Sequence, residues 1–240
     1  MNGWTSPEGI LYIKETLCTL LPWPNSPHNW QVNSTANILE ENNQLVIVAC
    51  GEGKTAVAYL HHILISHLSK KPLRSLPPFV RSIRSTTVVL MITPLIDVGL
   101  CQVEEMSRMG VRVVLLDKET VREAHQKGKN LLKEVEQGKW SVIIVSPERL
   151  NSPEFERIVQ NEWFRKLLAL YVINEAHVVL PWAADFCEAY GQINHFIVRI
   201  PVGIPVLAMS RTLGSEAKTS LTKFLGFCDG TYQTIQRSCE

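Results

Sequence analysis

The chain lacks any apolar run of about 18 residues, so its sequence predicts no membrane-spanning helix. The N-terminus has no basic start followed by an apolar block, which argues against a secretory signal. Net charge is almost absent, +1 over 240 residues, so a surface that binds nucleic acid must be a local one. The six cysteines include no C-x-x-C pair, and we expect free thiols in a reducing compartment.

What the sequence does contain is an alternation of two patterns. Helical patterns occupy 55–68, 96–109, 118–137 and 215–225, and the first 40 residues also look helical. Short apolar runs rich in β-branched residues predict strands buried on both faces, at 44–49, 87–92, 111–116, 141–146, 168–173 and 205–210. The alternation predicts an α/β fold with a mostly parallel sheet, whose ligands bind at the carboxyl ends of the strands.

One connection, 69–86, is long for a compact domain. It carries three prolines and five basic residues but no acid. Two interpretations stay open: a mobile solvated loop, or a flap that contacts phosphate groups.

A glycine-rich stretch, VIVACGEGKTAVAYL, joins a predicted buried strand to a predicted helix. Gly51 and Gly53 allow a tight turn that aims backbone N–H groups at phosphate oxygens. Lys54 supplies a positive charge for the outer phosphates, and the Thr55 hydroxyl can bind Mg²⁺. Val48 stands where the strict phosphate-loop pattern has its first glycine. The alternative is a glycine-rich turn without a ligand, but strand, turn, Lys-Thr and helix together favour a phosphate site.

A second motif, LYVINEAHVVL, ends another predicted buried strand downstream. In phosphate-loop ATPases an acid at this place holds Mg²⁺, and the acid after it positions the attacking water. Glu175 is available for the second task. Asn174 stands in the first place and carries no charge, so a magnesium site made by Thr55 and Asn174 would be degenerate.

In their order along the chain, these motifs resemble the first, ATP-binding RecA-like domain of the RecQ-like DNA helicases of superfamily 2. The resemblance implies a RecA-like P-loop NTPase sandwich with ATP and Mg²⁺ as cofactors. Gln31 matches the family's adenine-recognising glutamine, with His28 and Trp30 near enough to flank the base, and Glu175 and His177 match catalytic positions. The residues that match nucleic-acid-binding motifs are Pro94, Leu95, Pro147, Arg149, Trp182 and Phe186.

The resemblance also implies partners and boundaries. It covers residues 27–226, between an N-terminal extension at 1–26 and a tail at 227–240, and we expect the second RecA-like domain to be absent. The implied partner is single-stranded or partly duplex DNA, in a nuclear or otherwise intracellular location and without a membrane. We expect a monomer, with a second RecA-like lobe supplied by another chain as a candidate partner.

Several residues allow a purely structural interpretation. Trp182, Phe186 and Tyr190 recur at four-residue spacing, which is also typical of a helix face packed into a core. The histidines of 55–68 lack metal-binding spacing, so we interpret them as helix surface or satisfied core. The charged run at 118–139 favours a solvated helix face.

Three functions remain in competition. The first is an ATP- and DNA-binding helicase lobe, truncated or degenerate. The second is a module that binds nucleotide or nucleic acid without turnover, which Asn174 favours, together with Arg211 in place of a small residue of the family. The third, a phosphate-loop kinase or other nucleotide transferase, is disfavoured by the order of the motifs.

Overall fold

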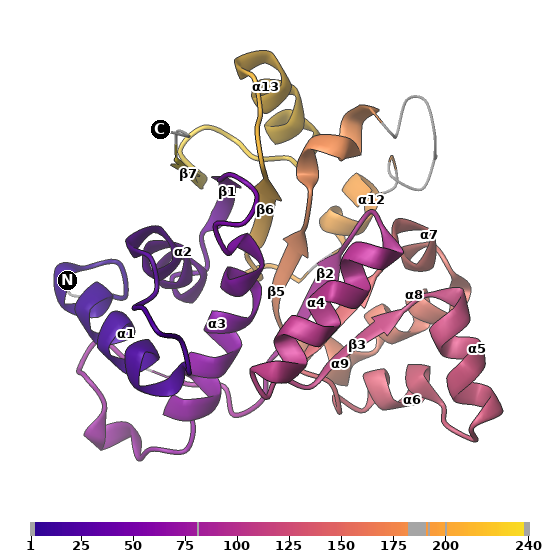
Figure 1. Cartoon of the computed structure of the whole chain (residues 1–240), viewed down its shortest axis with the longest axis horizontal. Coiled ribbons are helices and arrows are strands. Elements are labelled where there is room, and N and C mark those ends of the chain that lie inside the picture. The colour runs from indigo at the N-terminus through magenta and orange to yellow at the C-terminus, as the bar shows by residue number, and fades with distance from the viewer. Residues whose placement is uncertain (1–2, 81, 182–190, 192, 200, 238–240) are drawn as a thin grey trace.

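The computed structural model describes residues 3–80, 82–181, 191, 193–199 and 201–237. In this part of the chain seven parallel strands form one sheet in the order β3-β4-β2-β5-β6-β1-β7, with helices on both faces (Figure 1). The predicted α/β architecture is therefore confirmed. The strands are β1 (Asn43–Ile47), β2 (Val88–Ile92), β3 (Val113–Leu116), β4 (Val142–Val145), β5 (Leu168–Ile173), β6 (Val206–Ser210) and β7 (Tyr232–Gln236).

Alternate strand residues divide the core into two halves, because successive side chains point to opposite faces. In β1, Val46 belongs to one half and Leu45 and Ile47 to the other. The first face is covered by α1 (Pro7–Leu20), α2 (Asn29–Leu39), α3 (Lys54–Leu68) and α4 (Ile96–Arg108). The second is covered by α6 (Leu131–Glu136), α7 (Pro147–Leu150), α8 (Pro153–Gln160), α9 (Glu162–Leu167), α12 (Ile193–Val198) and α13 (Ser215–Phe224).

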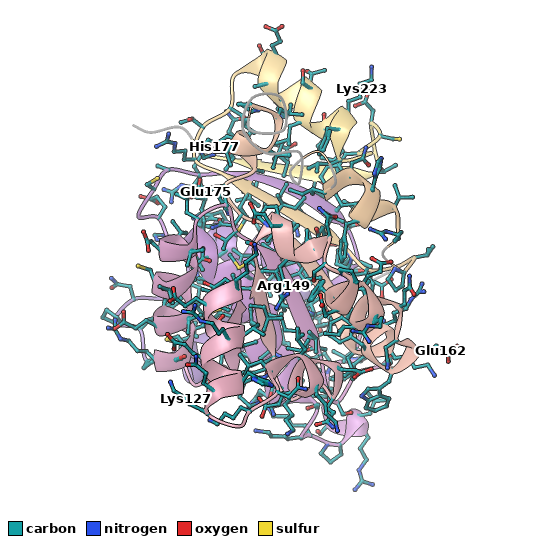
Figure 2. The ribbon with its side chains drawn as sticks, turned by 90° about the vertical axis from the view of Figure 1, so that its right-hand side faces the viewer. Lys127, Arg149, Glu162, Glu175, His177 and Lys223 are labelled. Atoms are coloured by element: carbon teal, nitrogen blue, oxygen red, sulfur yellow. The ribbon has the colours of Figure 1, made fainter. Side chains whose placement is uncertain are left out.

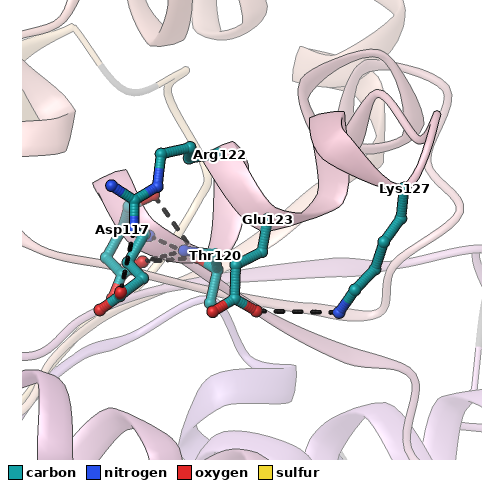
Figure 3. A network of polar contacts seen from close by, with 6 residues as sticks. Asp117, Thr120, Arg122, Glu123 and Lys127 are labelled. Carbon is teal, nitrogen blue, oxygen red and sulfur yellow. Dashed lines mark hydrogen bonds and ion pairs between the residues drawn. The ribbon is translucent and has the colours of Figure 1, made fainter.

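The charged run forms two helices where one was predicted at 118–137. The first, α5 (Lys118–Gln126), ends before Gly128, whose φ of 72° breaks the helix ahead of α6. Its start is fixed by a reciprocal cap: Asp117 Oδ1 accepts from Thr120 N, and Thr120 Oγ1 accepts from Asp117 N. Figure 3 shows this cap beside the exposed ion pairs that continue along α5. The solvated helix face is as predicted.

The long connection at 69–86 is largely exposed over its described residues, as a solvated loop would be, but it is not without structure of its own. It contains the short 3-10 helix η1 (Leu73–Ser75), and it buries Leu76, Phe79 and Val80. Phe79 packs edge-on against Trp4, with ring centroids 5.2 Å apart. The segment enters β2 at its amino end, about 22 Å along α3 from the glycine-rich loop. It therefore cannot serve as a flap over phosphate groups bound there.

The N-terminal residues and those beyond 226 both pack onto the sheet assembly. Helix α1 lies against α2 and α3, and β7 pairs in parallel with β1 from Asn43↔Tyr232 to Ile47↔Gln236. Strand β7 was not predicted because its sequence, YQTIQ, has no apolar run. Its largely exposed, polar side chains suit an edge strand.

Two further sequence expectations concern membranes and thiols. Over the ranges described, the structure contains no helix of the length and apolar character that a membrane crossing requires. Cys18, Cys50, Cys101 and Cys228 are free and exposed. Cys187 and Cys239 lie outside the described residues.

Candidate functional site

The glycine-rich loop connects β1 to α3 with the geometry that its sequence requires. Gly51 and Gly53 have φ of 83° and 75°, a left-handed conformation that other residues rarely adopt. Gly53 also caps α3, and a Cβ there would lie 2.9 Å from Gln31 Nε2. The loop therefore ends at the amino terminus of a 15-residue helix, where backbone N–H groups and the helix dipole favour an anion.

Lys54 is the first residue of α3 and its side chain turns back onto the loop. Its Nζ donates to Val48 O at 2.7 Å and to Ala49 O at 2.8 Å, and only 7% of the residue is exposed. To bind a phosphate, the Lys54 ammonium group would exchange these two carbonyl oxygens for phosphate oxygens as its hydrogen-bond acceptors. Thr55 follows on the first turn, half-buried at the same helix end.

Gln31 is buried beside the loop and uses both ends of its amide within the protein. Its Oε1 accepts from His28 N at 2.8 Å, and its Nε2 donates to Gly53 O at 3.0 Å. His28 is exposed, but Trp30 is 6% exposed and packs in the core. The expectation that Trp30 flanks a bound base is therefore wrong, because the indole is already covered by protein.

The second motif follows β5 at the same edge of the sheet as the loop. Asn174 is 4% exposed, and its backbone N donates to Ile92 O at 2.9 Å. Glu175 adopts φ of 50°, a conformation uncommon outside glycine, and opens the 3-10 helix η2 (Ala176–Val178). Figure 2 shows Glu175 and His177 close together.

His177 links the second motif to β6. Its Nδ1 lies 3.3 Å from Ser210 Oγ and 3.3 Å from Glu175 Oε2. The single hydroxyl hydrogen of Ser210 donates to Thr212 O at 3.1 Å, so we assign the proton on Nδ1 to His177, which then donates. Glu175 Oε2 is buried, and its approach to His177 does not have hydrogen-bond geometry. Among the described residues this oxygen therefore has no hydrogen-bond partner.

The electrostatics around His177 favour its neutral form. Burial lowers the pKa of His177 first, and the positive charges of Arg211 and Lys54 lower it further, against the opposing effect of Glu175. A neutral imidazole with a proton on Nδ1 can donate to Ser210 while it lies beside the Glu175 carboxylate. It can therefore fix the position of these side chains without adding a positive charge to the site.

The donors available to a Mg²⁺ ion at this edge are weak. Thr55 offers a neutral hydroxyl and Asn174 a neutral, buried amide, which leaves Glu175 as the one anionic group of the predicted set. Protein Mg²⁺ sites usually contribute one or two carboxylates beside the phosphates of the substrate. Arg211 adds a further positive charge near His177, so the residues present fit Mg²⁺ poorly.

The residues predicted to bind nucleic acid follow the neighbouring strands. Pro94 and Leu95 come after β2, where 49% of Leu95 is exposed, and Pro147 and Arg149 lie in α7 after β4. Because all strands are parallel, these residues share an edge with the loop. Strand β2 lies three positions and roughly 14 Å from β1, and β4 lies four positions and roughly 19 Å from it. Trp182 and Phe186 lie outside the described residues.

Two contacts at this edge join residues that no sequence motif connects. Ser210, at the end of β6, contacts His177, which follows the neighbouring strand β5. Arg237, just after β7, donates to Glu52 Oε2 in the loop at 2.6 Å, and its backbone N donates to Ile47 O. These two residues are 185 positions apart, and no sequence pattern connects them.

A cavity of about 700 Å³ lies elsewhere, at the amino end of the strands. Its walls include Trp4, Glu40, His61 and Arg84, and none of the predicted site residues. The chemistry of the glycine-rich loop therefore does not take place in it.

Comparison with known proteins defines the class and then the relatives. The DEAD/DEAH box helicase family matches residues 28–220, and the chain belongs to that family. It is 29% identical over 140 residues to the ATP-dependent DNA helicase RecQ of Bacillus subtilis, covering 58% of this chain and 22% of that protein. It is 24% identical over 239 residues to the mouse bifunctional 3'-5' exonuclease/ATP-dependent helicase WRN, covering 92% of this chain and 15% of that protein.

The solved structures support the fold. The Hef helicase domain of Pyrococcus furiosus superposes with a TM-score of 0.57 at 20% identity, over 94% of this chain and 39% of that chain. The predicted RecA-like sandwich and the resemblance to RecQ-type helicases are therefore confirmed. The chain spans less than a quarter of the length of either RecQ-type relative.

Proposed function

We propose that this chain is the ATP-binding and nucleic-acid-binding lobe of a RecQ-type ATP-dependent DNA helicase, in a degenerate form with weak or no hydrolysis. The observation that carries the proposal is the loop: Gly51 and Gly53 in left-handed conformations, ending on the amino terminus of α3 with Lys54 folded against it. The loop N–H groups and Lys54 would hold the phosphates, and Gln31 would hold the adenine once its amide is released from Gly53.

The nucleic-acid part of the proposal concerns the other half of the same edge. Pro94 and Leu95 would contact the DNA backbone from the start of α4, and Pro147 and Arg149 from α7. The Nε of Arg149 is buried without a hydrogen-bond partner in the described part of the chain. We further propose Trp182 and Phe186 as stacking residues for single-stranded bases. DNA as the partner implies a nuclear or otherwise intracellular place of action.

For catalysis we propose weak activity at most. Glu175 would orient the attacking water, beside the imidazole of His177, which is hydrogen-bonded to Ser210. When bound, Mg²⁺ neutralises charge that develops on the phosphates, and Thr55 and Asn174 would be its weak protein ligands. Loss of an outer partner of a metal typically reduces affinity or activity about 10–100-fold. A second RecA-like lobe, supplied by another chain, is a candidate partner that could complete the site.

A titration of ATP against wild type and Lys54→Ala tests the nucleotide site. Wild type should bind, and Lys54→Ala should lose binding, because the charge opposite the phosphates disappears. Lys71→Ala is the matched control, since Lys71 is exposed just beyond the far end of α3. Thermal unfolding of all three proteins checks that each is folded. Equal affinities for wild type and Lys54→Ala would place the nucleotide elsewhere.

The alternative function is a module that binds nucleotide or nucleic acid without turnover, and the buried amide of Asn174 favours it. Single-turnover ATPase measurements, with and without single-stranded DNA, separate the two. A rate that DNA raises and that Glu175→Gln abolishes supports a catalytic lobe. No turnover by a chain that still binds ATP supports the alternative.

A further inference from the structure

The charges around the glycine-rich loop are unevenly balanced. Glu52 is neutralised by Arg237 at 2.6 Å, and Glu175 lies against His177. Within the ranges that the structure describes, Lys54 and Arg211 form no ion pair. The loop therefore has two cations free of acidic partners, and its own acid is already compensated.

Arg211 is brought to this edge by the sheet. It directly follows β6, and β6 lies between β5, which leads to Asn174, and β1, which leads to the loop. Ser210 stands opposite Ile47, and its carbonyl accepts from Val48 N at 3.0 Å. The exposed side chain of Arg211 therefore begins one residue beyond the strand pairing that starts the phosphate loop.

The same edge offers little to a divalent ion. The place next to Glu175 that could hold a second carboxylate is filled by the amide of Asn174, which is 4% exposed. Of the residues predicted to hold a metal ion or to act beside it, Glu175 alone carries a negative charge, and Arg211 adds a positive charge near it. A triphosphate with four negative charges, in contrast, would meet Lys54, Arg211 and the amino terminus of α3.

We propose that this site binds the triphosphate of a nucleotide in its metal-free form, with Arg211 providing the positive charge that a divalent ion would otherwise provide. The proposal rests on the proposed nucleotide-binding function and adds to it the ionic form of the ligand and a specificity-determining residue. The guanidinium group is permanently charged and can donate to two phosphate oxygens, so it suits this task. Metal-free ATP is the preferred ligand of such a site, and the magnesium complex is the weaker one.

The test is a titration of ATP by calorimetry, once in excess EDTA and once in excess Mg²⁺. Wild type should bind at least as tightly in EDTA. Arg211→Gln should weaken binding in EDTA by about tenfold or more, the loss expected for a charge-assisted hydrogen bond. Arg165→Gln is the matched control, because Arg165 is an exposed arginine of α9 at the amino edge of the sheet, and it should change nothing.

A second variant reverses the preference. Asn174→Asp adds the missing carboxylate, so its ATP affinity should rise on addition of Mg²⁺. Wild-type binding that needs Mg²⁺, or an Arg211→Gln variant with unchanged affinity in EDTA, would overturn the inference. In either case the proposed nucleotide site at the loop would still be supported if Lys54→Ala abolishes ATP binding. Absence of ATP binding in both conditions would instead refute the proposed function.

Discussion

Acid should destabilise this fold through two neighbouring histidines of α3. The histidines of α3 were expected on the helix surface or satisfied in the core. His61 lies in the core, 5% exposed, but its Nδ1 lacks a hydrogen-bond partner within the described ranges. Burial, then His62 and Arg84, lower the pKa of His61 to about 3. Burial, then Arg112, lower the pKa of His62 to about 4, against a hydrogen bond at Thr87.

The sign of the effect follows from proton uptake. Unfolded histidines titrate near pH 6.5, whereas these two stay neutral in the folded state until the pH approaches their lowered pKa values. Well above pH 6.5 neither group makes the free energy of unfolding depend on pH, because both states bind no proton there. Below it, the unfolded chain binds more protons, and each histidine removes about 1.4 kcal/mol per pH unit. Two histidines over about two pH units reach an upper bound on the order of 5 kcal/mol, comparable to the whole stability of many domains.

Denaturant unfolding between pH 7.5 and about pH 4.5 measures this directly. Wild type should lose stability steeply below pH 6.5. His62→Gln should lose it less steeply, since one of the two protons is no longer taken up. His125→Gln, which removes an exposed histidine of α5, should leave the slope at the wild-type value and so controls for general acid effects. A flat wild-type profile, or equal slopes for wild type and His62→Gln, would refute the reasoning.

The remaining predictions concern the site edge. Gly53→Ala should destabilise the fold by about 1–2 kcal/mol, because alanine is strained at φ of 75° and its Cβ meets Gln31. Denaturant unfolding measures the loss of stability, and an ATP titration measures the effect on the loop. Unchanged values in both would contradict the loop geometry. Single-stranded DNA should bind weakly and more weakly as salt rises. Arg149→Ala should reduce that binding in a fluorescence anisotropy titration, whereas Arg157→Ala on α8 should not. Trp182→Ala should cost roughly 1–3 kcal/mol per stacked base, and binding that ignores both salt and Trp182 would exclude this surface.

The buried strands were the predictable part of the fold, and the physical reason is their environment. Strands such as β2, Val88–Ile92, are buried on both faces, so every residue must be apolar and the run stands out in the sequence. The edge strand β7 has no such constraint, and its polar residues leave no signal. In the connection at 69–86 the described basic residues are exposed, as their charge predicts, whereas the core contacts of Phe79 and Val80 have no periodic pattern around them.

The candidate site also has a part that the sequence predicts and a part that it does not. Residues that act together within one turn, such as Gly53 with Lys54, are adjacent in the sequence, so the motif alone places them. Contacts made across strands carry no local pattern. The bond of His177 to Ser210 depends on β5 lying next to β6, and the ion pair of Arg237 with Glu52 depends on a strand that was not predicted. The chemical groups of the site were therefore predictable from motifs, whereas their partners are set by the order of the strands.

The two halves of the site edge meet where β5 lies beside β2. Asn174 N donates to Ile92 O at 2.9 Å, and the chain then continues from Ile92 through Thr93 to Pro94 and Leu95. This bond uses the peptide group of residue 174 and not its side chain. Exchange of an acid for an amide at 174 therefore changes the charge offered to a nucleotide while the backbone that positions Pro94 and Leu95 is unchanged. The nucleotide part of the proposed function therefore depends on the side chain of residue 174, whereas the placement of Pro94 and Leu95 depends on its peptide group.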